Sequence, residues 1–218
     1  MSKPATAYPV TLSVDYPDRD LNRLTTFFRS ILIIPAGVIL ALLSSPIWSW
    51  GTGTDANGMP QIWRALFGTG TFLFLPTLLM ILFRRKYPRW WFDWNVNVTK
   101  FSARVGAYAA LVTDEYPSTE REQVVHITIP FPDAKKDLLP GMPLVKWFLA
   151  IPHWFLLFFL GIAAGFCIFI SWFAILFTGR FPRGLFDFVV GVGRWGLRAG
   201  AYAFLLVTDV YPPFSLDE

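Results

Sequence analysis

An almost unbroken apolar run at residues 144–177 constrains the fold of this chain more than any other feature. Lys146, near its start, is the only lysine, arginine or acidic residue in the run. Two further apolar stretches cover residues 27–50 and 62–83. Runs of about 18 or more apolar residues are typical of membrane-spanning helices, because a helix satisfies its own backbone hydrogen bonds in lipid. The sequence therefore predicts an integral membrane protein.

The composition supports a membrane protein over a soluble domain with a large core. Of the 218 residues, 54% are hydrophobic and only 16% are charged, whereas an average soluble domain has about 25% charged residues. The net charge of +4 could indicate nucleic-acid binding, but the basic residues flank the apolar runs, where membrane topology places them. We therefore expect membrane lipids as partners, and no nucleic acid.

The chain contains the same pattern twice, which predicts two tandem units at residues 1–120 and 121–218. The segments that match are Leu82-Phe83 with Leu176-Phe177, Tyr87-Pro88-Arg89 with Phe181-Pro182-Arg183, Phe92-Asp93 with Phe186-Asp187, Arg104 with Arg198, Gly106-Ala107-Tyr108 with Gly200-Ala201-Tyr202, and Thr113-Asp114 with Thr208-Asp209.

Each unit opens with a short strand signal. Residues 10–16 and 125–129 alternate apolar and polar side chains, are rich in β-branched residues and end near a proline. Because a lone short strand gains little stability, we expect the two strands to pair into a small ribbon on the membrane surface. His126 falls on the polar side of this alternation and is interpreted as a solvated strand residue.

Lysines and arginines predict the orientation of the first two spans. The basic residues before residues 27–50 and after residues 62–83 are Arg19, Arg23, Arg29, Arg84, Arg85, Lys86 and Arg89. The connecting loop carries no lysine or arginine between Gly51 and Gln61. The positive-inside rule then places both ends of this hairpin, and both chain termini, in the cytoplasm.

The run at residues 144–177 is too long for one perpendicular span, because a helix of that length reaches roughly 50 Å and the hydrocarbon core is about 30 Å thick. The repeat favours a second hairpin that turns near Gly161 and Gly165; one strongly tilted helix is the alternative. His153 lies early in this run beside Pro152, and Cys167 lies late in it. We interpret both as packing residues rather than ligands. The expected fold is an all-α membrane protein with about four transmembrane helices.

Each hairpin is followed by a segment with one charged stripe. Asp187, Arg194 and Arg198 are separated by seven and four residues, so they share one face of a helix with 3.6 residues per turn. The first unit repeats this spacing with Asp93, Lys100 and Arg104.

Two placements of these segments compete. An amphipathic helix in the interface keeps its charges among the headgroups, whereas a spanning helix buries each charge at about 2.5–3.5 kcal/mol. The interface is therefore favoured. Four basic residues, Lys100, Arg104, Arg194 and Arg198, are the candidates for contact with anionic headgroups, at about 1 kcal/mol each. Asp93 and Asp187 are the carboxylates of the stripes.

The chain resembles, over essentially its whole length and as two tandem copies, the prokaryotic membrane family called domain of unknown function 4389. The segments that carry the resemblance are WFAILFTGRFP at residues 172–182, Gly184-Leu-Phe-Asp187 and Tyr211-Pro-Pro-Phe214. The first unit is more divergent, with Arg84-Arg85-Lys86 in place of Thr178-Gly179-Arg180. The resemblance implies two spans per copy followed by an amphipathic helix, and it brings no established activity. Some members carry a lipase label, but this sequence has no Gly-x-Ser-x-Gly motif.

The sequence lacks a phosphate-binding glycine loop, a zinc-ligand pair and a nucleophile with a neighbouring base. We therefore predict no enzymatic activity, no metal and no cofactor. The favoured function is an accessory or scaffold protein of the cytoplasmic membrane that contacts headgroups, a membrane partner or a second copy of itself. The alternative is a small transporter, channel or lipid-handling protein. A transport path usually has ionisable residues within the spans, whereas here such residues lie only near the edges of the spans. This favours the accessory or scaffold function.

Overall fold

A computed structural model of the chain describes residues 8–17, 20–44, 76–119, 121, 123–135, 137–139 and 141–217. Its elements in chain order are β1 (Thr11–Val14), α1 (Arg23–Leu32), α2 (Ile34–Ser44), α4 (Arg89–Ala109), β2 (Val125–Thr128), α5 (Met142–Thr178), α6 (Arg183–Gly200) and the π-helical segment η2 (Ala201–Leu205). Residues 76–84 are also helical.

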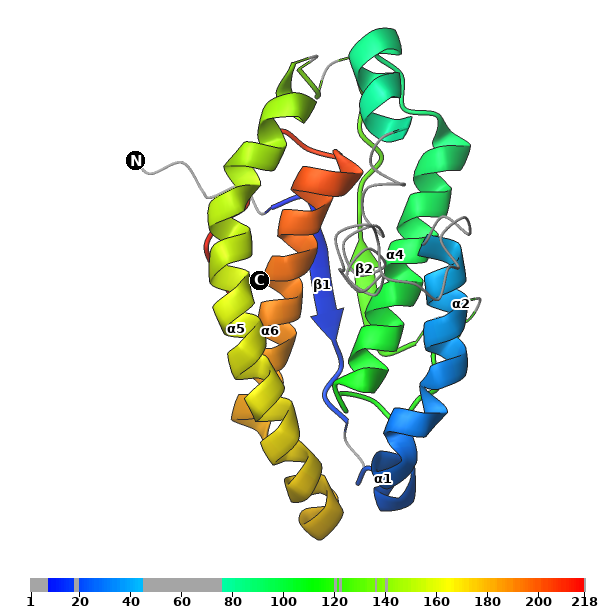
Figure 1. Cartoon of the computed structure of the whole chain (residues 1–218), viewed down its shortest axis with the longest axis vertical. Coiled ribbons are helices and arrows are strands. Elements are labelled where there is room, and N and C mark those ends of the chain that lie inside the picture. The colour runs from blue at the N-terminus through cyan, green and yellow to red at the C-terminus, as the bar shows by residue number, and fades with distance from the viewer. Residues whose placement is uncertain are drawn as a thin grey trace, which may run out of the picture.

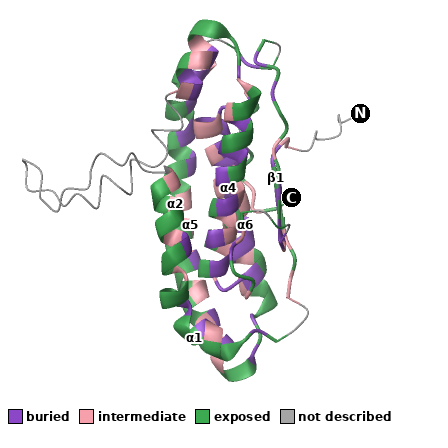
Figure 2. Cartoon of the chain, turned by 90° about the vertical axis from the view of Figure 1, so that its right-hand side faces the viewer, coloured by how far each residue is buried: buried purple, intermediate pink, exposed green. Residues whose placement is uncertain are grey.

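The described part of the chain is built in three layers. Helices α2 and α5 form one outer layer, α4 and α6 form the middle layer, and the β1–β2 ribbon covers the other side (Figures 1 and 2). Helix α6 packs on α5 and on β1, while α4 packs on α2 and on β2. The middle helices therefore have an apolar helix on one side and the ribbon on the other.

The two predicted strands are present and they pair. Strands β1 and β2 are antiparallel, with Leu12 opposite Ile127 and Ser13 opposite His126. Leu12, Val125 and Ile127 are buried in one apolar cluster with side chains of α4 and α6. The alternate residues are exposed, and His126 contacts the exposed Asp15 carboxylate at 3.1 Å. The predicted pairing of the two strands is confirmed, with one face of the ribbon apolar and buried and the other polar and exposed. Its position on the membrane surface stays a prediction.

The predicted hairpin at residues 144–177 is wrong, because these residues lie within the single helix α5. Gly161 and Gly165 are helical, and no charged or strongly polar loop interrupts the run to allow a chain reversal in lipid. The reversal comes at Gly179, whose φ of 78° is favourable only for residues such as glycine. At 1.5 Å per residue, α5 is about 55 Å long.

Two helical stretches, Arg23–Leu43 and Met142–Thr178, have the length and apolar composition of membrane spans. This agrees with membrane association, and within the described residues it replaces the expected four spans. Of the first predicted hairpin, residues 27–44 fall in α1 and α2, and residues 76–84 form the end of the second predicted span. The loop and the rest of that hairpin, residues 45–75, lie outside the described residues.

The two segments with charged stripes are helices, as expected. Helices α4 and α6 each begin directly after a proline, Pro88 and Pro182, whose fixed φ favours a helix start but not its interior. Both helices bury an apolar face, which includes Phe92 and Phe186 at equivalent places in the first turn. Their depth relative to a bilayer stays a prediction.

Candidate functional site: two buried ion pairs and the charged stripes

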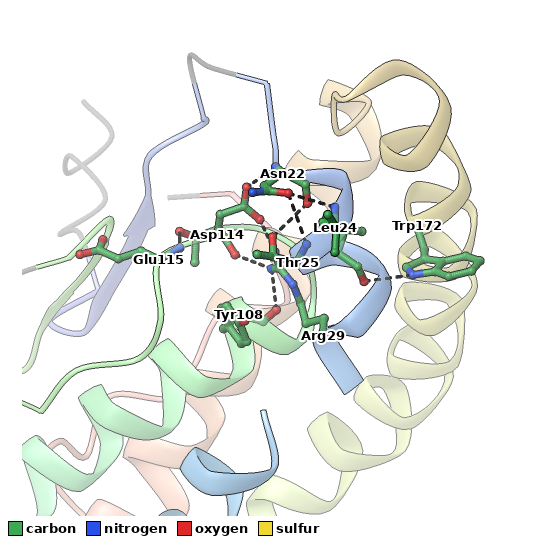
Figure 3. A network of polar contacts seen from close by, with 10 residues as sticks. Asn22, Leu24, Thr25, Arg29, Tyr108, Asp114, Glu115 and Trp172 are labelled. Atoms are coloured by element: carbon green, nitrogen blue, oxygen red, sulfur yellow. Dashed lines mark hydrogen bonds and ion pairs between the residues drawn. The ribbon is translucent and has the colours of Figure 1, made fainter. Parts of the chain in front are cut away.

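The first buried ion pair joins α1 to the turn that follows α4. Arg29 is 3% exposed, and its guanidinium forms an ion pair with Asp114. It also donates hydrogen bonds to the backbone carbonyl oxygens of Tyr108 (3.0 Å) and Thr113, and it lies 4.4 Å from the centroid of the Tyr108 ring. Figure 3 shows these side chains converging beneath the first turn of α1. The buried cation is thus compensated by one carboxylate and two carbonyls.

Local backbone geometry brings Asp114 to this position. Leu111, with a φ of 64°, reverses the chain at the end of α4. Asp114 then accepts a hydrogen bond from the backbone N–H of Asn22 at 2.6 Å, and the Asn22 side chain caps α1 by accepting from Leu24 N at 2.9 Å. A carboxylate at a helix N-terminus is favoured by the unpaired N–H groups and the helix dipole. Asp114 therefore binds both the backbone at the start of α1 and the Arg29 side chain near the end of α1.

A second ion pair, with a similar set of partners, lies at the start of α5. Lys146 is fully buried, and its Nζ contacts the Asp209 carboxylate and the Thr208 carbonyl oxygen, both at 2.7 Å. The ammonium lies 5.2 Å from the centroid of the Tyr202 ring. Asp209 also accepts a hydrogen bond from the backbone N–H of Leu139 at 2.7 Å. Each pair thus ties the start of an apolar helix to a Thr-Asp turn.

A repeated spacing in the sequence indicates these ion pairs, although the sequence analysis did not predict them. Asn22 and Arg29 are seven residues apart, as are Leu139 and Lys146, and in both cases the cation stands at the head of an apolar run. A cation buried there needs a carboxylate partner. The repeated Thr-Asp segments offer one in each half, since Asp114 and Asp209 close the two matching patterns.

The arginines of the predicted stripes point toward the ribbon side of the molecule. Arg194 donates from Nε to the Leu12 carbonyl oxygen at 2.9 Å and from Nη1 to the Leu216 carbonyl oxygen at 2.7 Å. It therefore joins α6 to β1 and to the C-terminal tail. The guanidinium of Arg198, which is 3% exposed, lies 6.0 Å from the centroid of the Tyr8 ring.

On the other middle helix, Arg104 donates to the Ser118 carbonyl oxygen at 2.7 Å. Lys100 is half-buried, while Asp93 and Asp187 are exposed. The structure keeps the two stripes on separate helices and does not bring them into one site. Headgroup contact by the four basic residues stays a prediction, and three of them have partners within the protein.

His153 of α5 is enclosed by the C-terminal tail. Its Nδ1 accepts a hydrogen bond from Trp195 Nε1 at 2.9 Å, and its ring stacks on Phe214 with 4.2 Å between centroids. Tyr211 adds a hydroxyl that donates to the Leu149 carbonyl oxygen at 3.1 Å. These contacts describe a packing role that holds the tail against α5 and α6. Among the described residues, no group of three or more potential metal ligands comes together.

Residues 143–215 match the family model described as "Domain of unknown function (DUF4389)". The match covers about a third of the chain. The matched segment contains almost all of α5, together with α6, η2 and both members of the Lys146–Asp209 pair. The match supports the resemblance of the second half to this family. The family model matches no segment in the first half, so the two expected tandem copies are found as one. No curated protein and no solved structure matches the chain.

Proposed function

We propose that this chain is an integral membrane protein embedded through its α1–α2 and α5 layer, and that it serves as a non-enzymatic accessory or scaffold protein. The observation that carries this proposal is that the outer helical layer exposes apolar side chains while the ribbon on the opposite side exposes polar ones; Figure 2 shows the order of these layers. The partners we propose are membrane lipids on the apolar side and a membrane protein or a second copy of the chain.

The apolar layer exposes far more large hydrophobic side chains than a water-soluble surface tolerates. Monomeric soluble proteins rarely expose contiguous apolar patches beyond a few hundred Å². Here the exposed side chains of the layer include Phe27, Ile31, Ile34, Val38, Leu42, Phe148, Phe155, Phe158, Phe166, Phe169 and Phe177. On the opposite side the ribbon exposes Ser13, His126 and Thr128. Lipid is the solvent that suits the first surface, and water suits the second.

The packing of α6 along α5 favours an orientation in which the layers lie parallel to the membrane. A perpendicular α5 would exceed the hydrocarbon core of about 30 Å. It would also bring α6 and the ribbon to membrane depth, where an exposed charge such as Asp187 costs about 2.5–3.5 kcal/mol. With the layers parallel to the membrane, both ends of α5 face the cytoplasm, as do the ribbon and the C-terminal tail. Basic residues at both ends, such as Lys135 and Arg183, agree with the positive-inside rule.

Several features support two copies of one unit at residues 1–120 and 121–218. The Arg29–Asp114 and Lys146–Asp209 pairs have equivalent partners. Left-handed residues occur at matching places, Arg85 with Gly179 and Leu111 with Leu206. The second copy has one more residue between its Tyr and its Thr-Asp turn, and the π-helical segment η2 accommodates that residue. Duplication explains why the two strands pair with each other and why the ion pairs recur.

The membrane placement is tested by introducing charge into the apolar layer. We expect Phe155→Lys combined with Phe166→Lys to weaken membrane attachment, because both side chains are exposed on α5 and each lysine costs about 2.5–3.5 kcal/mol in hydrocarbon. Flotation of cell membranes and resistance to carbonate extraction measure this. Val210→Lys is the matched control, since Val210 is an exposed apolar residue of the tail. Equal attachment of both variants would contradict the embedded layer.

The accessory function is tested by purification in a mild detergent and by reconstitution. We expect a stoichiometric membrane protein or a second copy to remain bound, and proteoliposomes to hold proton and anion gradients as well as empty liposomes do. Flux that depends on the protein would instead support the transporter alternative.

A further inference from the structure

An apolar cavity of about 290 Å³ lies between the two middle helices, beneath the ribbon. Its walls come from β1, β2, α4, the turn after α4, and α6. The residues that line it are Leu12, Val14, Val125, Ala103, Gly106, Ala107, Ala110, Val112, Val189, Val190, Gly193 and Leu197. Every one of these side chains is apolar or absent, so no side chain of the wall offers a hydrogen bond to a water molecule.

The cavity exists because small residues line both helical walls. A Cβ added to Gly106 of α4 would meet no atom within 4 Å, and one added to Gly193 of α6 would meet only Leu12 Cδ2 at 3.8 Å. Such small residues in membrane helices commonly let helices approach closely. Here α4 and α6 are instead held apart, and each packs on its own outer helix and its own strand.

An apolar cavity without polar partners stays dry and binds apolar molecules. A cavity of roughly 150 Å³ lined by aliphatic and aromatic side chains is sufficient for benzene. The cavity beneath the ribbon has about twice that volume. Its occupant is therefore expected to be hydrocarbon, and larger than one small ring.

The ribbon lines one side of the cavity, and α4 and α6 line two more. Within the described part of the chain, no residue of α1, α2 or α5 lines it, so these helices leave the side toward the apolar layer open. Gly106 and Gly193 are both exposed. The turn after α4 lies between this space and a second cavity of about 600 Å³ between α1 and α5, because Ala110 and Val112 line the first while Ala109 and Leu111 line the second.

We propose that the cavity binds the hydrocarbon chain of a membrane lipid, which enters between α4 and α6 from the α1–α2 and α5 layer. The inference rests on the proposed function in one respect, since the bilayer supplies the chain. The proposal also explains why small residues occur on α4 and α6 at positions where these two helices do not pack closely on each other. Arg29, which lines the second cavity, is already paired with Asp114, so the site requires no anionic headgroup.

The experiment compares three proteins purified from the same membranes in a mild detergent: wild type, Gly193→Leu and Gly196→Leu. Both substitutions add the same side chain to α6, but Gly193 lines the cavity and Gly196 does not. Native mass spectrometry then counts the phospholipid molecules that stay bound to each chain. We expect wild type and Gly196→Leu each to retain one tightly bound phospholipid per chain. The amount of phospholipid bound per chain should be at least tenfold lower in Gly193→Leu.

Gly106→Leu provides an independent test from the opposite wall, in case Gly193→Leu does not fold. Equal retention by the wild type and a folded cavity variant would overturn the inference, because the lipid would then bind elsewhere on the apolar surface. Absence of bound phospholipid from the wild type would overturn it too. Membrane flotation of the same variants separates the two proposals. If the cavity variants float normally, the embedded layer stands whatever the lipid count shows.

Discussion

The Arg29 and Lys146 ion pairs occupy equivalent positions in the two halves but use different cations. Arg29 reaches one carboxylate and two carbonyls through its forked guanidinium, whereas Lys146 reaches one carboxylate and one carbonyl from a fully buried ammonium. In each case a carboxylate also binds the backbone at the start of the apolar helix. The comparison teaches that position and charge matter here, while the type of cation varies. These charges join the start of each apolar helix to the turn that follows a middle helix.

The largest expected effect comes from removing the carboxylate of either pair. Asp114→Ala and Asp209→Ala should each destabilise the fold by about 3–5 kcal/mol, because each leaves a buried cation without a counterion. Chemical unfolding in detergent measures the change. Asp20→Ala is the control, since Asp20 pairs with Arg180 at the exposed surface, where solvent screens the two charges and the pair adds little to stability. If the buried and exposed variants behave alike, the comparison between the halves fails.

A second contrast between the halves concerns His153. In the second half His153, Trp195 and Phe214 fill the space beneath the tail. The matching residues in the first half are Ala36, Phe101 and Thr119, and they line an open cavity of about 570 Å³. The first half thus has an alanine and a threonine where the second half has two rings, and a cavity remains where the other half is packed.

His153→Ala should therefore destabilise the second half by about 1–3 kcal/mol, because the buried Trp195 Nε1 loses its acceptor. The same variant should release the C-terminal tail, so limited proteolysis near Leu216 should become faster. Thr119→Ala, a change at the first-half position that matches Phe214, should alter stability by less than about 0.5 kcal/mol. An unchanged cleavage rate in His153→Ala would show that the histidine does not hold the tail.

The smallest expected effect concerns Tyr87 at the start of α4. Burial raises the pKa of Tyr87 to about 12, from the ordinary value near 10. Because the folded state favours the protonated phenol, its contribution to stability is complete below pH 10 and is lost as the pH rises toward 12. Tyr87→Phe removes the hydrogen bond to the Leu205 carbonyl oxygen and should cost about 0.5–1.5 kcal/mol near pH 8.

Unfolding midpoints measured from pH 8 to 11 test this, with the two proteins compared at each pH. The difference between wild type and Tyr87→Phe should shrink as the pH rises above 10. A difference that stays constant across the range would contradict the buried phenol.

Local patterns in the sequence predicted local structure well. Alternation identified β1 and β2, and the seven-and-four spacing of the charges identified α4 and α6, because both signals depend on neighbouring residues. The hairpin in α5 was wrong for a physical reason. The hairpin was inferred from the repeat together with the length limit of a perpendicular span, and a helix that is tilted or lies along the membrane is not bound by that limit.

The partners of the charged residues could not be predicted in the same way. Periodicity shows that Arg194 and Arg198 share a face, but the strand that covers this face is distant in sequence, since Leu12 precedes Arg194 by 182 residues. The same holds for Arg29 and Asp114, which are 85 residues apart. Only the tertiary fold brings such residues together. The repeat alone offered a hint, by placing a cation and a carboxylate at matching positions in both halves.

The central claim is that α5 lies in the apolar layer with both of its ends on one side of the membrane. Single cysteines at Leu139 and Gly184, in a Cys167→Ser background, flank α5 at exposed positions. A membrane-impermeant thiol reagent applied to right-side-out and inverted vesicles reports the side of each. The account predicts that both cysteines react only in inverted vesicles. Reaction of the two cysteines from opposite sides would show that α5 crosses the bilayer once, and would contradict the account.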